Sequence, residues 1–152
     1  MKVTDLINEE MIILDLESRT KGEVIDELVL LLFNQGRINH IKKMTKAILK
    51  REKLSSTGVG DGIAIPHAKS KAVIEASIVL GLSKHGIDYD SIDGKPVYIF
   101  CLIATPEKAN DLHLDALSKL ARMLIHEEFR ISLLNAQSKG EIIELIKQRE
   151  LE

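Results

Sequence analysis

The apolar run over residues 97–105 most strongly constrains what this chain can fold into. It contains no charged side chain, which is typical of a β-strand that is covered on both faces. Shorter apolar runs over residues 11–14, 63–65 and 77–82 are further strand candidates. Because segments with helical periodicity separate these runs, the sequence predicts a layered α/β domain in which helices pack on a central sheet.

Capping residues mark the ends of the predicted helices. The first helix starts at a capping box formed by Thr20 and Glu23 and stops at Gly36. Ser138 begins the last helix in the same way and is boxed by Glu141. Further helices are predicted over residues 39–53, from Asn110 or Asp111 to Ile125, and over residues 127–135.

Length and charge narrow the class of protein. The 152 residues suit one domain over residues 1–152, and 45% hydrophobic with 29% charged residues is an ordinary globular balance. The net charge of −2 gives no global field that attracts nucleic acid or an anionic membrane. We therefore expect no nucleic-acid partner, and we expect other partners to be recognised through local surfaces.

Several features bear on where the protein resides. No apolar run approaches the roughly 20 residues that span a bilayer, and the N-terminus lacks the apolar stretch of a signal peptide. Cys101, the only cysteine, lies in an apolar run and is expected to be a small buried side chain, not a catalytic thiol. These features predict a cytoplasmic protein. Met1 and the charged C-terminus favour a stand-alone subunit over a piece of a fusion.

His67 is the first candidate functional residue. It follows Pro66, which fixes its own φ and pushes the residue before it toward extended geometry. Ligand crevices in α/β sheets lie beyond the carboxyl ends of strands, which favours a functional imidazole at this place. The alternative is a loop histidine beside a turn proline. Gly58 and Gly60 lie just upstream and allow backbone to approach a ligand closely, although an ordinary tight turn explains them equally well.

His113 and Arg51 are weaker candidates on pattern alone. His113 lies near a helix N-terminus on the face that also carries Leu117 and Leu120. A helix N-terminus offers free N–H groups and a positive dipole end to an anion. Arg51 ends the second predicted helix, and its guanidinium suits phosphate oxygens. The alternatives are a semi-buried histidine with a structural partner and a solvated helix-terminal arginine.

Other kinds of site are poorly supported. The metal-binding spacings H-E-x-x-H and paired C-x-x-C are absent, so no metal and no other cofactor is expected. The sequence has no G-x-S-x-G elbow of a serine hydrolase. The glycine turn precedes a strand, not a helix, which argues against a P-loop. The remaining histidines, His40, His85 and His126, are predicted to lie at the surface, with His85 in a turn.

Together these residues resemble the fructose- and mannitol-type enzyme IIA family of the bacterial sugar phosphotransferase system. Gly62, Ala64, Pro66 and His67 match the family's G-x-A-x-P-H stretch. The segments over residues 86–97 and 113–117 resemble the fructose-type branch. The resemblance covers nearly the whole chain and implies a mixed central sheet flanked by helices on both faces.

The resemblance also implies a mechanism. It identifies His67 as the phosphorylated nucleophile, His113 as the second active-site histidine and Arg51 as the phosphate-binding arginine. Thr57, Gly58 and Gly60 are expected to bind the phosphoryl group through a hydroxyl and N–H groups. The donor would be phosphorylated HPr and the acceptor a cysteine of an enzyme IIB domain, so that the membrane is reached only through the IIC transporter.

Two other readings of the sequence stay open. The first is a regulatory, nitrogen-type enzyme IIA in which phosphorylation of His67 controls binding to other proteins. The second is a small-molecule binding domain whose histidines are structural. The resemblance also implies that the membrane component, and not this domain, recognises the sugar.

Overall fold

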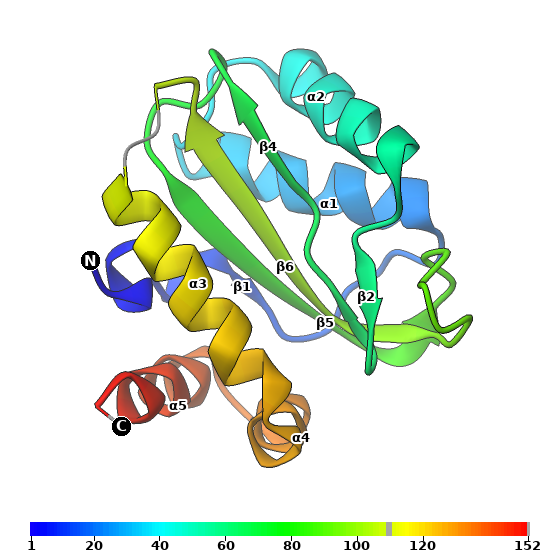
Figure 1. Ribbon diagram of the computed structural model, residues 1–152, viewed down its shortest axis with the longest axis vertical. Helices are drawn as coiled ribbons and strands as arrows, with labels where there is room; N and C mark the ends of the chain where they lie inside the picture. The colour runs from blue at the N-terminus through cyan, green and yellow to red at the C-terminus, as the bar shows by residue number, and fades with distance from the viewer. Residues whose placement is uncertain (109–110, 152) are drawn as a thin grey trace.

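A six-stranded mixed sheet lies at the centre of the computed structural model, which describes residues 1–108 and 111–151 (Figure 1). The strands are β1 (Ile12–Ile13), β2 (Gly58–Gly60), β3 (Ile63–Ala64), β4 (His67–Ser70), β5 (Ser77–Ile87) and β6 (Val97–Pro106). The helices are α1 (Lys21–Asn34), α2 (Ile41–Leu54), α3 (Asp111–Ile125), α4 (Glu127–Asn135) and α5 (Lys139–Glu150), with two short 3-10 helices, η1 (Val3–Asp5) and η2 (Glu9–Met11).

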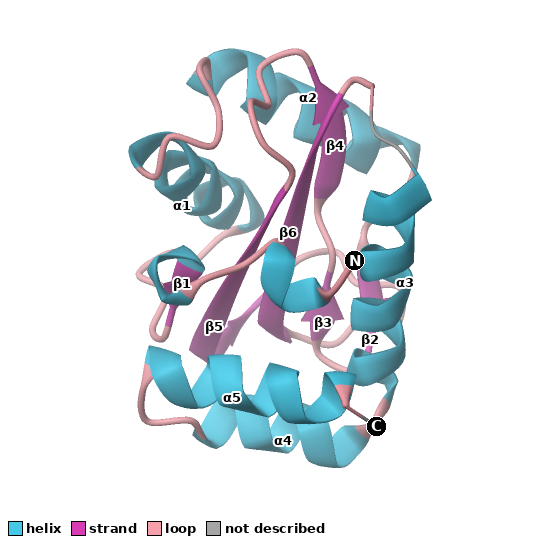
Figure 2. Cartoon of the chain, turned by 90° about the vertical axis from the view of Figure 1, so that its left-hand side faces the viewer, coloured by secondary structure: helices cyan, strands magenta, loops and turns pink. Residues whose placement is uncertain are grey.

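The predicted fold class is confirmed. The strand order is β1-β5-β6-β3-β2, and β4 also pairs with β6. Strand β5 is antiparallel to β6, whereas β3 and β4 are parallel to it. Helices α1 and α2 cover one face of the sheet and α3 covers the other, with α4 and α5 side by side at one end (Figure 2).

Strands β3 and β4 are two parts of one strand that is interrupted at Pro66. Ile63 pairs with Ile99 and His67 with Ile103 along the same edge of β6, so the register is unchanged across the break. Pro66 has no N–H to give to the ladder, and its carbonyl accepts from Ile103 N at 2.9 Å. The sequence placed His67 after a strand end; the structure places it at the start of the second segment.

The histidine predicted in a turn lies in a strand. His85 is exposed, as expected, but it belongs to β5, which continues to Ile87. The register between β5 and β6 shifts between Leu82 and Ile87, so this part of the strand lacks the regular alternation that a sequence pattern detects. The N-terminal strand is also shorter than predicted, because residues 9–11 form η2.

The predicted helix caps are confirmed. Thr20 Oγ1 accepts from Glu23 N at 3.2 Å, and Ser138 Oγ accepts from Glu141 N at 3.1 Å. Gly36 has φ +70° just after α1 ends, a conformation that glycine adopts without strain. Helix α3 begins at Asp111; the alternative start, Asn110, lies outside the described residues.

The core lies between the sheet and the helices on its two faces. Strand β6 is buried from Ile99 to Thr105, which explains its uncharged sequence. Cys101 is fully buried, as predicted, and burial raises the pKa of its thiol to about 12. Among the described residues, no helix combines the length and the apolar character that crossing a membrane requires.

Candidate functional site

The interrupted strand orients the ring of His67. Nδ1 of His67 lies 2.8 Å from the carbonyl oxygen of Ile65. That carbonyl belongs to the residue before Pro66, at the break between β3 and β4. A carbonyl oxygen only accepts hydrogen bonds, so Nδ1 carries the proton and donates it. In the neutral ring, Nε2 therefore keeps its lone pair.

His67 and His113 line the same pocket. It has a volume of about 310 Å³ and lies between the β4–β6 pair and the first turns of α3. Apart from these two histidines, Lys69 and Thr105 are its polar lining residues. The remaining wall is aliphatic, with Leu114, Leu117, Leu120 and Ala121 on α3 and Ile65, Ala68 and Ile103 on the strands. The structure thus brings together the two histidines that the sequence identified separately.

Lys69 and Thr105 are pocket residues that the sequence did not indicate. Lys69 follows His67 by two residues in β4, so the two side chains lie on the same face of the strand. Lys69 pairs with Thr105 in the register between β4 and β6. The spacing of two residues between His67 and Lys69 was the available signal in the sequence. It indicates a shared face only if a strand starts at His67, whereas the sequence predicted a strand that ends before it.

Arg51 does not line this pocket. It lies in the last turn of α2, and its guanidinium donates from Nη1 to the carbonyl oxygen of Ser55 at 3.0 Å. This bond closes the C-terminal end of the helix, where carbonyl groups lack partners within the helix. A phosphate-binding role for Arg51 therefore stays a proposal, and it would use the guanidinium N–H groups that do not bond to Ser55.

Thr57, Gly58 and Gly60 also lie outside the histidine pocket. Thr57 is buried, and its hydroxyl donates to Glu52. A Cβ atom on Gly58 would lie 2.9 Å from Ser91 Cα, so close packing explains this glycine. Gly60, with φ +97°, turns the chain between β2 and β3. Packing or backbone conformation thus explains the residue type at each of these three positions. The sequence pattern alone could not distinguish this explanation from ligand binding.

A buried polar network supports the segment between α2 and β2. The side chain of Glu52 is 4% exposed; it accepts from Thr57 N at 3.1 Å, and Lys21 Nζ lies 3.0 Å away. Burial alone would raise the pKa of Glu52, but the Thr57 hydrogen bonds and the Lys21 ammonium hold the pKa below its usual value. Tyr89 lies beside them, and burial raises the pKa of its hydroxyl.

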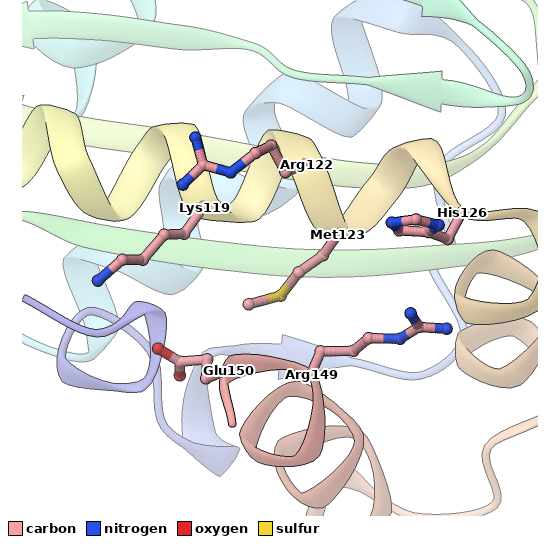
Figure 3. A pocket seen from close by; sticks show the side chains of 6 residues that line it. All are labelled: Lys119, Arg122, Met123, His126, Arg149 and Glu150. Atoms are coloured by element: carbon pink, nitrogen blue, oxygen red, sulfur yellow. The ribbon is translucent and has the colours of Figure 1, made fainter. Parts of the chain in front are cut away.

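A second cavity lies between α3 and α5, with a volume of about 410 Å³ (Figure 3). Lys119 and Arg149 are among its basic lining residues, but Asp115 lies 3.1 Å from Lys119 and Glu128 lies 2.7 Å from Arg149. Glu150 adds a carboxylate to the lining. Because acidic groups offset these basic side chains, we assign no function to this cavity.

The other histidines are exposed, as predicted. His40 caps α2, with Nδ1 accepting from Lys43 N at 3.1 Å, and His126 precedes α4. Within residues 1–108 and 111–151, no three His, Cys, Asp or Glu side chains converge to hold a metal ion. The candidate site therefore consists of the histidine pocket.

Comparison with known proteins assigns this mixed α/β fold and its histidine pocket to a family. Residues 5–149 match the family model "Phosphoenolpyruvate-dependent sugar phosphotransferase system, EIIA 2". The chain belongs to this enzyme IIA family, whose members are components of a phosphotransferase.

Fructose-specific proteins are among its relatives. It is 47% identical over 150 residues to the fructose-specific EIIABC component of Bacillus subtilis, a match that covers 99% of this chain and 24% of that protein. It is 37% identical to the fructose-specific EIIA component of Haloferax volcanii, with 97% and 98% covered. The crystal structure of the nitrogen regulatory protein IIA-Ntr from Neisseria meningitidis is also similar, with a TM-score of 0.87, 31% identity and 95% and 98% covered.

Proposed function

We propose that Nε2 of His67 accepts a phosphoryl group from phosphorylated HPr and passes it to a cysteine of an enzyme IIB domain during sugar uptake. The observation that carries this proposal is the bond from Nδ1 to the Ile65 carbonyl, which leaves the Nε2 lone pair for attack. In the first step an Nε2–P bond forms, and the N–P bond of the donor histidine breaks, with its electron pair returning to that ring. In the second step a thiolate attacks phosphorus and Nε2 leaves.

The charge on the transferred group needs donors that are already in position. His113 lies in the first turn of α3, where N–H groups lack partners within the helix and the dipole is positive. Lys69 adds a cation, and Thr105 a hydroxyl, in the same lining. We propose that Lys69 and Thr105 stabilise the transferred group together with His113, and that Arg51 contributes the N–H groups that do not bond to Ser55.

The rim of the site suits a protein partner. Leu114, which lines the pocket, is 53% exposed. Val59 and Ile125 are 48% and 71% exposed on an adjoining groove that shares Ile65 with the pocket. Apolar side chains around a shallow site can be covered by a docking protein that carries the donor or acceptor group.

A transport role in a fructose-type system is favoured over a regulatory one. Fructose-specific relatives reach the highest identity among those described above, although a nitrogen regulatory protein shares the fold. We propose that the protein works in the cytoplasm with a IIB domain.

Phosphate transfer from the labelled chain to a fructose-type IIB domain tests the transport role. Rapid transfer supports transport. A labelled chain that stays stable and transfers no phosphate supports the regulatory alternative.

The variant His113→Ala separates acceptance from onward transfer. We expect it to be labelled by phosphorylated HPr but to pass phosphate to IIB about 10²–10³-fold more slowly, because one preorganised donor is lost. Single-turnover measurements of both steps check this. His126→Ala, on an exposed histidine beyond the end of α3, is the control and keeps both rates. Equal rates for His113→Ala and wild type would remove His113 from the mechanism.

Lys69→Gln tests the residue that only the structure identified. Removing a cation about 4 Å from a dianion in a solvated site is expected to slow phosphorylation roughly ten-fold. Lys71→Gln is the matched control, because Lys71 is exposed and lies near Glu107 outside the pocket lining. Both variants lose one positive charge, so a slower rate in both would indicate general electrostatics and would argue against a specific role for Lys69.

A further inference from the structure

The outer surface of α2 carries a concentration of positive charge that the net charge of the chain conceals. The helix has five lysines and Arg51, and its single acidic residue, Glu52, is buried. The lysines are exposed, and none of them forms an ion pair within the described parts of the chain: Lys42, Lys43, Lys46, Lys50 and Lys53. The whole chain has a net charge of −2, so the charge is distributed very unevenly.

Apolar side chains lie among these lysines. A groove of about 680 Å³ runs between α1 and α2, and its lining includes Ile41, Leu49 and Asp26. Ile41 is 36% exposed and Leu49 is 41% exposed. Leu30 and Phe33 follow Asp26 on the same face of α1 at helical spacing and are 48% and 42% exposed. The result is a two-helix surface of exposed apolar side chains, with the lysines of α2 on one side and the exposed carboxylates of Glu23 and Asp26 on α1.

We propose that this α1–α2 surface docks on anionic lipid bilayers. Lysines around exposed Leu, Ile and Phe side chains are the composition of helices that lie at a membrane interface. Protein interfaces are depleted in lysine at their centre and favour arginine and several aromatic residues. Sites for single-stranded nucleic acid depend on aromatic side chains that stack on the bases. Of the side chains described on this surface, Phe33 alone is aromatic, so a nucleic-acid site is disfavoured.

The orientation is compatible with phosphoryl transfer. Helices α1 and α2 lie on one face of the sheet, and α3, which forms a wall of the histidine pocket, lies on the other (Figure 2). A molecule held to a bilayer through α1 and α2 would therefore keep His67 open to a protein partner. The proposal goes beyond the function of His67 and does not depend on it.

Sedimentation with lipid vesicles tests this surface. We expect the chain to bind vesicles of phosphatidylglycerol and phosphatidylcholine, to bind pure phosphatidylcholine weakly, and to be released by salt. Lys46→Gln, Lys50→Gln and Lys53→Gln together are expected to weaken binding to the anionic vesicles about 100-fold. Glutamine keeps a similar helix propensity, so α2 is expected to stay folded, and an unchanged circular dichroism melt checks this.

A matched triple variant identifies the surface responsible. Lys84→Gln, Lys95→Gln and Lys139→Gln remove the same charge from exposed positions outside α1 and α2, and this variant is expected to bind like the wild type. Equal losses in the two variants would overturn the proposal, as would no binding to anionic vesicles. Stronger binding to duplex DNA or to an acidic protein than to vesicles would also overturn it and would identify a different partner.

Discussion

His67→Ala is expected to reduce phosphate incorporation from phosphorylated HPr to background. The substitution removes the one nitrogen that the strand break at Pro66 presents with a free lone pair. The half-buried ring gives up a single hydrogen bond to Ile65, so the free energy of unfolding should fall by only about 1 kcal/mol. Acid-labile, base-stable label on the purified chain is the measurement.

The control for this variant is His85→Ala. His85 is exposed in β5 and lines none of the cavities described above, so its loss should leave incorporation unchanged. Thermal unfolding of both variants shows whether each is folded. Normal labelling of folded His67→Ala would contradict the proposed function, even if His113→Ala were inactive.

Glu52→Ala is expected to lower the free energy of unfolding by about 3 kcal/mol. The change leaves Thr57 N–H without its acceptor and Lys21 without the carboxylate 3.0 Å away. Urea unfolding measures the loss. Glu144→Ala is the matched control, because Glu144 is 65% exposed and pairs with Lys147; an exposed pair of this kind contributes at most about 1 kcal/mol. Similar losses for both variants would contradict a structural role for the buried network.

The same network gives a pH dependence. The pKa of Glu52 in the folded chain lies below its ordinary value of 4.5. Its contribution to stability is therefore complete above about pH 4.5 and is lost as the pH falls through the lower folded pKa. Glu52→Gln keeps an oxygen for Thr57 but has no proton to gain, so its stability should change less with pH over this acid range.

The sequence predicted those parts of the fold whose signals are local. The caps at Thr20 and Ser138 depend on side chains three residues apart, and they were found at the predicted positions. The 97–105 run was predicted because full burial leaves no place for charge along β6. Strand order and register depend on pairings between residues distant in the chain, so they came from the structure alone; the resemblance implied only a mixed sheet flanked by helices.

The sequence predicted the part of the site that lies in a recognisable motif. Pro66 and His67 pointed to a constrained imidazole, but the sequence could not show that the Ile65 carbonyl selects the ring tautomer. Thr57 looked like an available hydroxyl because nothing local indicates that Glu52 folds back to accept from it. Lys69 was overlooked because its face is defined only once β4 is known to begin at His67.

The proposed function depends on Nε2 of His67 carrying the phosphoryl group. Nitrogen-15 and phosphorus-31 NMR of the chain phosphorylated by HPr tests it most directly, because coupling between the two nuclei identifies the bonded nitrogen. We expect phosphorus on Nε2 of His67 and a proton on Nδ1. Phosphorus on Nδ1 of that ring, or on His113, would contradict it.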